Sequence, residues 1–251
     1  MRTHARLLRP ALVVAVASAS LAAPAAQAAE DWEWMVAPYI WGVSIDTDLQ
    51  RTVPPEGGIE NDTGFDDVLD KFDGAFLLHA EGSNGEYGVF TDFVYLGLAD
   101  DHDYPRFHTE SDLDARLFEL AGVWTPGGDR RQGIDVFAGL RYIDVDLGVQ
   151  FDPENPAFDS SGLEAGDSFS DFMIGARYRW ALSDRWSLAL RGDSSFGQTE
   201  GTWNASAIAS YRMDNGAWLL GYRYLSVEID NGPSNADLTV MGPIVGYGFI
   251  F

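Results

Sequence analysis

The chain has 251 residues, of which 39 are acidic and 16 are basic, and it contains no cysteine. The net charge of −23 excludes nucleic acid as a partner, because the phosphate backbone would be repelled. Without cysteine the chain can form no disulfide bond, thiolate nucleophile or cysteine-ligated zinc site, and we expect no cofactor.

The first residues predict a secretory signal peptide. Three arginines come before an apolar run of small side chains at 11–23, and Ala26-Gln27-Ala28 is a typical cleavage site. We therefore expect residues 1–28 to be removed after export to the periplasm, and residues 29–251 to form one domain. No later apolar run reaches the length of about 18 residues that a transmembrane helix needs.

Alternation of apolar and polar residues with a period of two dominates the rest of the chain and predicts β-strands. Each predicted strand has about the length that a tilted strand needs to cross a bilayer. The predicted strands are 32–45, 73–82, 86–99, 112–124, 133–147, 169–182, 186–196, 202–212, 217–228 and 238–251.

The connections between these strands alternate in length. Tight turns are predicted at 83–86, 183–185 and 213–216, and Asn-Gly pairs in the first and last of them supply the positive φ angles that hairpin turns require. A slightly longer turn, 125–131, joins the fourth and fifth predicted strands. The other connections are mostly longer loops, at 46–72, 100–111, 148–168 and 229–237, with a helical turn within 65–74 and a short connection near 197–201. Short turns at one rim and long loops at the other are typical of outer-membrane barrels, whose termini lie at the periplasmic rim.

The two faces of single strands support a barrel in lipid. In the sixth predicted strand Phe172, Ile174 and Trp180 lie on one face, whereas Asp171 and Arg177 lie on the other. Aromatic residues at the ends of the apolar face are typical of the girdles at the membrane interfaces. The sequence therefore predicts an all-β, antiparallel up-and-down transmembrane barrel of about ten strands, with eight or twelve as alternatives.

The last strand is apolar on both faces and places Tyr247, Phe249 and Phe251 at alternate positions. It resembles the C-terminal strand of bacterial outer-membrane β-barrels, which the barrel-assembly machinery recognises. The stretches 37–42 and 64–82 also resemble uncharacterised Gram-negative outer-membrane proteins. The resemblance implies a barrel in the outer membrane, with membrane lipid and the assembly machinery as partners, and it implies no activity.

The same alternation predicts a charged interior. Six arginines would face six carboxylates, so we expect a salt-bridged, largely plugged lumen with a structural or small-solute role. A narrow selective channel is the alternative. The predicted lumen residues are His79, Glu81, Asp92, Glu119, Asp135, Arg141, Asp171, Arg177, Arg179, Arg191, Asp193, Arg212 and Arg223.

Clustered carboxylates near the outer rim suggest two interpretations. Oxygen ligands of this kind bind Ca²⁺ or Mg²⁺, so the clusters are weak candidates for divalent cation sites. Their spacing does not match a calcium-binding loop, and we favour solvation of an acidic surface. The candidates are Asp46, Asp48, Asp100, Asp101 and Asp103, with Asp144 and Asp146 as a further pair.

An enzyme is the alternative function. The pairs Asp46/Asp48 and Asp100/His102 resemble the acidic and Asp-His pairs of omptin proteases. However, these pairs lie on the first and third predicted strands, and short motifs arise by chance in so acidic a chain. His79 is predicted to point inward beside Glu81, as a hydrogen-bonding core residue. We therefore expect no catalytic centre, with an omptin-like or lipid-modifying enzyme as the alternative.

Two prolines predict an irregular seam where the first strand meets the last. Pro38 and Pro243 cannot donate to a β-ladder, so we expect a bulge or break there, with Gly42 and Gly242 absorbing the distortion. The alternative resembles lipid-modifying barrels, in which such a break admits an acyl chain or another lipophilic ligand from the bilayer. The predicted lateral path would pass Ile40 and Ile244.

Overall fold

The computed structural model describes residues 32–51, 57–64, 68, 72–104, 107–129, 131–153, 161–230 and 234–251. They belong to one compact unit, Asp31–Phe251. The predicted signal peptide, 1–28, lies outside the described residues and stays a prediction.

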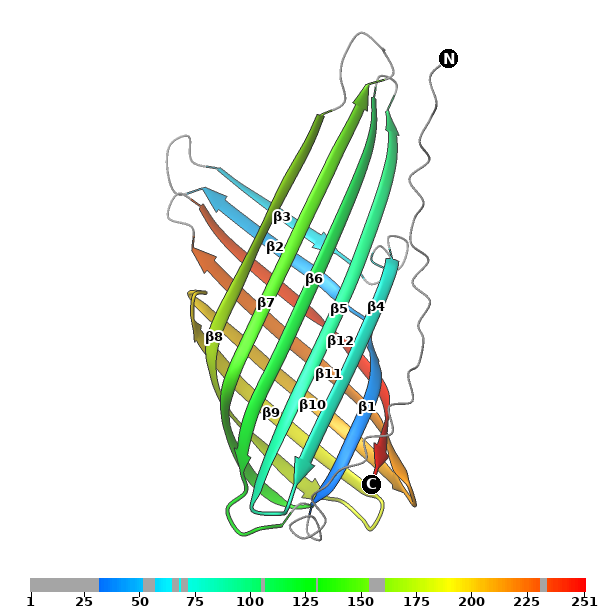
Figure 1. Cartoon of the computed structure of the whole chain (residues 1–251), viewed down its shortest axis with the longest axis vertical. Helices are drawn as coiled ribbons and strands as arrows, with labels where there is room; N and C mark the ends of the chain where they lie inside the picture. The colour runs from blue at the N-terminus through cyan, green and yellow to red at the C-terminus, as the bar shows by residue number, and fades with distance from the viewer. Residues whose placement is uncertain are drawn as a thin grey trace, which may run out of the picture. The chain divides into compact units, whose positions relative to one another are not determined.

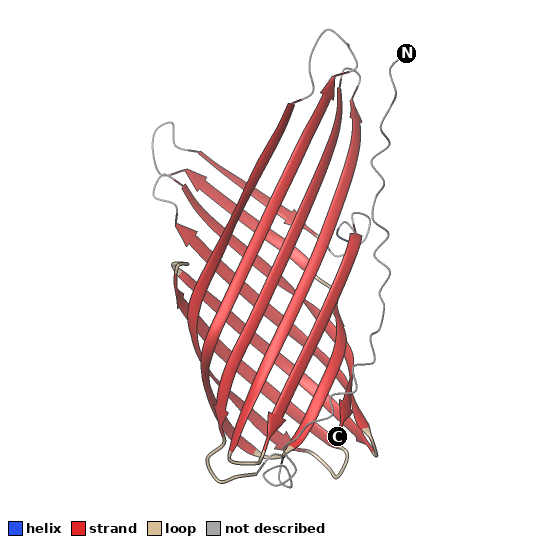
Figure 2. Ribbon diagram, in the orientation of Figure 1, coloured by secondary structure: helices blue, strands red, loops and turns tan. Residues whose placement is uncertain are grey.

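The described residues form twelve β-strands (Figures 1 and 2). Among these residues no helix is long and apolar enough to cross a membrane. The strands are β1 (Glu33–Trp41), β2 (Ser44–Arg51), β3 (Gly57–Thr63), β4 (Phe72–Ser83), β5 (Tyr87–Tyr104), β6 (Phe107–Trp124), β7 (Gly133–Pro153), β8 (Ser161–Ala181), β9 (Trp186–Gly197), β10 (Gly201–Met213), β11 (Gly216–Asp230) and β12 (Ser234–Ile250).

The strands close into an antiparallel barrel with ten positions in its wall. From β4 to β12 each strand pairs with the next one in the chain, and β1 closes the ring by pairing with both β4 and β12. β2 continues the path of β1 along β12, so the two strands share one position in the wall. β3 is an additional strand that forms a hairpin with β2. The predicted all-β barrel of about ten strands is confirmed.

Several segments predicted as loops are strands instead. The segment 46–72 contains most of β2 and all of β3, while β5 and β6 extend through most of 100–111. β7 and β8 likewise extend into 148–168. These extensions carry polar residues on both faces, so the alternation that identifies a strand half-buried in lipid is absent from them. Within the predicted helical turn, the Val68 N–H donates to the Gly64 carbonyl at 3.0 Å, as in one turn of helix.

The barrel wall is apolar outside and polar inside over the half nearer the short turns. Leu140 and Trp203 are each 60% exposed on the outer surface, whereas Glu119 and Asp135 inside are fully buried. Large exposed apolar side chains occur on nearly all strands of the ring, which is the inverse of a water-soluble barrel. Such a surface requires lipid around it.

The seam between the first and last strands keeps one register, so the predicted bulge is wrong, whereas the predicted break in the ladder does occur at Pro38. Trp41 pairs with Ile244 and Ser44 with Met241, which is one register without a shift among the described pairs. The Gly42 N–H donates to the Pro243 carbonyl at 2.9 Å across the point where β1 ends and β2 begins. β12 keeps its register here because the Pro243 carbonyl still accepts a hydrogen bond and because Gly242, which has no side chain, allows the two backbones to approach closely.

Pro38 interrupts this seam without shifting it. The N–H groups of Trp34 and Gly42 donate to β12, at Phe251 and Pro243. Alternate residues of a strand direct their backbone groups to the same neighbour, so the nitrogen of Pro38 also faces β12, where it has no proton to donate. The β1–β12 ladder accordingly lacks pairs at Ala37 and Pro38 and resumes at Tyr39.

We expect Gly242→Ala to destabilise the barrel by about 1–3 kcal/mol, the usual cost of overpacking. A Cβ atom at Gly242 would lie 1.8 Å from the carbonyl oxygen of Gly42, so the seam would have to separate. Gly122→Ala is the matched control, because no atom lies within 4 Å of the Cβ position there. Urea unfolding in phospholipid vesicles measures both variants, and equal midpoints would contradict the close contact.

Candidate functional site

The interior of the barrel changes character at one height. On β6 the inward residue Glu119 is followed toward the loop end by Leu117, and on β7 Arg141 is followed by Ile143. β4, β5 and β11 show the same change, at His79/Leu77, Asp92/Val94 and Arg223/Leu225. The lumen therefore consists of a polar plug, formed by the inward charged residues toward the turn end, and an apolar cavity on its loop-end side.

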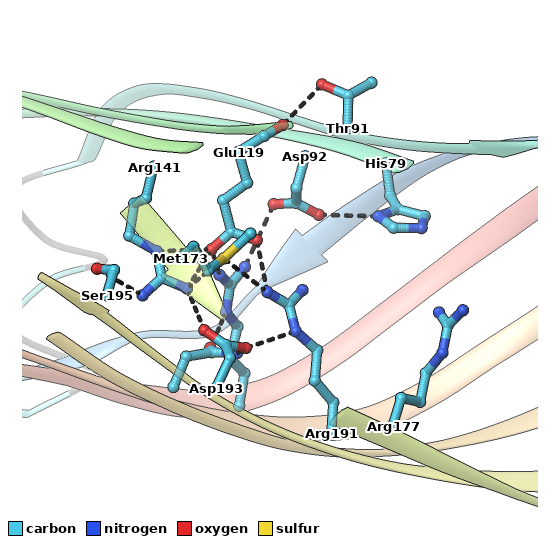
Figure 3. A network of polar contacts seen from close by, with 12 residues as sticks. His79, Thr91, Asp92, Glu119, Arg141, Met173, Arg177, Arg191, Asp193 and Ser195 are labelled. Atoms are coloured by element: carbon cyan, nitrogen blue, oxygen red, sulfur yellow. Dashed lines mark hydrogen bonds and ion pairs between the residues drawn. The ribbon is translucent and has the colours of Figure 1, made fainter. Parts of the chain in front are cut away.

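Glu119 lies at the centre of the polar plug and accepts bonds from three arginines (Figure 3). Nη2 of Arg141 lies 2.7 Å from Oε1, and Nη2 of Arg191 lies 2.8 Å from Oε2. Nη2 of Arg223 lies 3.1 Å from Oε1. Asp193 shares two of these arginines, at 2.5 Å from Arg141 and 2.6 Å from Arg191. Charge-assisted bonds thus connect β6, β7, β9 and β11 across the lumen.

A second ion-pair group lies closer to the turn end. Arg177 holds Glu81 with two bonds, at 2.8 and 2.6 Å, and donates from Nε to Asp135 at 2.8 Å. Arg179 lies 2.7 Å from the same Asp135 carboxylate, and the Thr125 hydroxyl donates to it at 2.8 Å. The parallel bonds between Arg177 and Glu81 join β8 to β4 on different sides of the interior.

Asp92 and Asp171 complete the polar plug through hydroxyl and histidine partners. The Tyr39 hydroxyl donates to Asp92 at 2.8 Å, and Nδ1 of His79 lies 3.1 Å from its other oxygen (Figure 3 shows the His79 contact). Asp171 accepts bonds from the Ser195 and Thr199 hydroxyls. Each of these buried carboxylates therefore has partners that compensate for the loss of water.

Twelve of the thirteen predicted lumen residues lie in this polar plug, and Arg212 does not. Arg212 pairs with Glu33 at 2.8 Å at the turn-end rim, where both side chains are more than a third exposed. The charge-based prediction missed polar residues without charge, such as Asn204, which bridges Asp193 and Arg223. Their inward position in the alternation is the signal that could have identified them.

The apolar cavity has a volume of about 490 Å³ and reaches the outer surface of the barrel. Buried residues such as Trp41, Val94 and Leu225 line its inner part. Pro38, Ile40 and Phe76 line its outer part, where Ile40 is 72% and Phe76 is 54% exposed. The cavity thus passes through the wall between β1 and β4.

The strand pairing explains this opening. The ladder between β1 and β4 ends at Pro38 and Leu78, and β2 pairs with β3 from Ile45 onward. Between these points the described residues Tyr39 to Val43 have no ladder partner in β4. The buried side chain of Val68 packs against the same apolar cluster.

The opening in the wall therefore lies on the other side of the first strand from the predicted lateral path. Ile40 does line the opening, but Ile244 is buried and pairs with Trp41 in the wall between β1 and β12. The path was predicted at the seam of the first and last strands, and this position is wrong. Pairing with β12 survives both prolines, whereas pairing with β4 ends because β3 takes the place beside β2.

The acidic rim candidates do not assemble into a site among the described residues. β2, which carries Asp46, does not pair with β5, which carries Asp100, Asp101, Asp103 and His102. The side chains of Asp48 and of these four residues lie outside the described part. No group of three or more acidic or histidine side chains that could hold a metal ion occurs among the described residues.

The remaining rim pair, Asp144 and Asp146, has an arginine partner. Nη1 of Arg116 lies 2.6 Å from Asp144 and 3.2 Å from Asp146. The guanidinium group therefore occupies the position that a cation would need between these two carboxylates.

We expect Glu119→Gln to destabilise the barrel by about 3 kcal/mol or more, because three buried arginines lose their shared negative charge. Glu33→Gln is the matched control, since its pair with Arg212 is exposed at the rim and should contribute under about 1 kcal/mol. Urea unfolding in vesicles measures both. Similar losses in the two variants would contradict a central role of Glu119.

No protein-family model and no curated protein matches the sequence. Solved structures do match: the outer membrane protease OmpT of Escherichia coli has a TM-score of 0.54 at 8% identity, covering 88% of this chain and 97% of that chain. Ail of Yersinia pestis, at 7% identity and a TM-score of 0.37, covers 88% and 99%. OprG of Pseudomonas aeruginosa, at 10% identity and a TM-score of 0.31, covers 87% and 95%.

The likeness to OmpT concerns the fold alone, and together with the exposed apolar wall it supports the predicted location in the outer membrane. The chain has the fold of the bacterial outer-membrane β-barrel proteins.

Proposed function

We propose that this barrel takes up a lipophilic ligand sideways from the membrane, while the polar plug closes the axial route through the lumen. The observation that carries the proposal is the apolar cavity that opens through the wall between β1 and β4. Its volume of about 490 Å³ lies in the range of cavities that bind small organic molecules. The proposed role is binding or transfer without catalysis.

The polar plug favours lateral over axial passage. Arg141, Glu119 and Asp193 are almost completely buried, and their bonds cross the lumen. A barrel of about ten strands has an interior that side chains nearly fill. A ligand in the apolar cavity would have to separate several buried ion pairs to continue along the axis, which is costly.

The backbone around the opening gives a physical reason to regard it as functional. Tyr39 and Trp41 direct their backbone groups toward β4, because the alternate residues direct theirs toward β12. No ladder partner in β4 meets them among the described residues. Backbone groups outside a ladder are costly in lipid, so an opening here is expected to persist only if it serves a purpose.

The C-terminal residues support a role in assembly. The Phe251 N–H donates to the Trp34 carbonyl at 3.0 Å, and the Trp34 N–H donates to the Phe251 carbonyl at 2.8 Å. The last residue thereby closes the barrel while its ring, like that of Phe249, stays exposed on the outside. We propose that the assembly machinery engages these rings together with Tyr247, before they meet lipid.

A covalent staple across the opening tests the lateral route. The chain has no native cysteine, so Ile40→Cys with Phe76→Cys can be joined selectively by a bifunctional methanethiosulfonate linker. We expect the linker to lower uptake of an apolar fluorophore, N-phenylnaphthylamine, by cells that produce the barrel. Reductant removes the linker and should restore uptake.

The matched control places the same linker where β1 and β4 are already paired. Val36 and Ala80 are register partners, so joining Val36→Cys to Ala80→Cys should leave uptake unchanged. Equal uptake by the two linked barrels, at equal amounts of folded protein, would rule out entry between β1 and β4.

A further inference from the structure

A second cavity lies at the turn end of the lumen, and arginines from several elements line it. Its volume is about 720 Å³, and we call it the vestibule. Arg131 belongs to the β6–β7 turn and Arg185 to the β8–β9 turn, while Arg177 and Arg179 lie on β8 and Arg212 lies near the end of β10. Five positive side chains thus face one space in a chain whose net charge is −23.

The carboxylates of the vestibule do not balance these arginines. Glu81 is held by Arg177 and lies 3.7 Å from Arg179, and Glu33 pairs with Arg212. The third, Asp129, accepts a backbone N–H. Three carboxylates therefore line the vestibule against five arginines, and Asp135, which is not part of the lining, pairs with Arg177 and Arg179 as a fourth.

Arg131 and Arg185 supply the surplus positive charge. The guanidinium of Arg131 donates to two backbone carbonyls, those of Ser183 and Asp184, at 3.2 and 2.7 Å. Arg185 donates to the Tyr211 hydroxyl at 3.2 Å. Among the described residues neither guanidinium forms an ion pair, although Asp214 lies close enough to interact electrostatically with Arg185. Both arginines therefore keep N–H donors for an anion.

Deeper in the vestibule, one buried donor has no acceptor among the residues that the structure describes. The Nε atom of Arg179 is buried without a hydrogen-bond partner, whereas its other nitrogens meet Asp135 and Glu81. A buried N–H without an acceptor costs about 1–3 kcal/mol, so a bound acceptor there would be favourable.

Much of the rest of the vestibule wall is apolar, although His79 and three serines also line it. Met35, Ile208, Leu219 and Ile250 line it together with two tryptophans, Trp34 and Trp186. A ligand that satisfies both parts of the wall needs an anionic head group and an apolar body.

We propose that the vestibule binds a small organic anion, a carboxylate or phosphate monoester with an apolar body, that arrives from the periplasm in solution. Around the turn end β1 is paired on both sides, with Ser83 at Glu33 and with Ile250 at Met35. The vestibule therefore opens along the barrel axis and has no lateral route from lipid at this level. Its ligand reaches it through water, unlike that of the apolar cavity, and the two sites stand independently.

Calorimetric titration of the full barrel in nanodiscs with phenyl phosphate tests this site. We expect saturable binding that weakens with added salt, and much weaker binding of benzyl alcohol, which has no charge. Replacing both surplus arginines, Arg131→Gln with Arg185→Gln, should weaken phenyl phosphate binding about tenfold or more. Arg116→Gln is the matched control because Arg116 lies outside the vestibule, and it should leave binding unchanged.

Three outcomes would overturn the proposal. They are no saturable binding of phenyl phosphate, equal binding of benzyl alcohol, and an equal loss of affinity in the Arg116→Gln control. Electrophoretic mobility before and after heating establishes that each variant is folded. Anionic lipid added to the nanodiscs should not compete, since competition would place the anion site at the lipid surface.

Discussion

The structure depends on one buried carboxylate, Glu119, which three arginines share. Three guanidinium groups can approach each other inside a protein only if negative charge lies between them, and Asp92 and Asp193 supply the rest of it. The network is therefore one cooperative unit, in which removing any member leaves its partners with uncompensated charge. Because its members come from β5, β6, β7, β9 and β11, the same interaction that stabilises the barrel also crosses its lumen.

The plug determines what the space on its loop-end side can do. A chamber closed on its axial side by ion pairs and lined by aliphatic side chains offers little to a hydrophilic solute. The wall is open at another place, since the ladder between β1 and β4 ends at Pro38 and β3 occupies the position beside β2, and this is the entrance that we propose. The apolar cavity and its opening in the wall thus lie on the loop-end side of the polar plug, where we propose contact with lipid. The vestibule lies on the opposite side of the plug, where we propose contact with water.

The barrel and the charged interior could be predicted from the sequence, because the alternation of apolar and polar residues along a strand indicates which side chains point inward. It identified the barrel and the charged members of the plug, including Glu119 and Arg141. The change from charged to aliphatic inward residues, as at Glu119/Leu117, is also visible in single strands. However, it becomes a cavity only when neighbouring strands bring these changes to one height, and a single strand does not reveal its register. The opening beside β4 depends on the pairing of β3 with β2. Both strands lie in acidic segments without alternation of apolar and polar residues, so the sequence pattern did not predict that they pair.

Accessibility inside the apolar cavity is the most direct test of the central claim that this space communicates with lipid and not with water along the axis. Leu225→Cys would carry a nitroxide spin label into the cavity lining, without interference from native cysteine. In nanodiscs, electron paramagnetic resonance measures collisions of the label with oxygen, which concentrates in lipid, and with a water-soluble nickel chelate. The account predicts frequent collisions with oxygen and few with the chelate. A label reached mainly by the chelate would contradict it and indicate an aqueous channel.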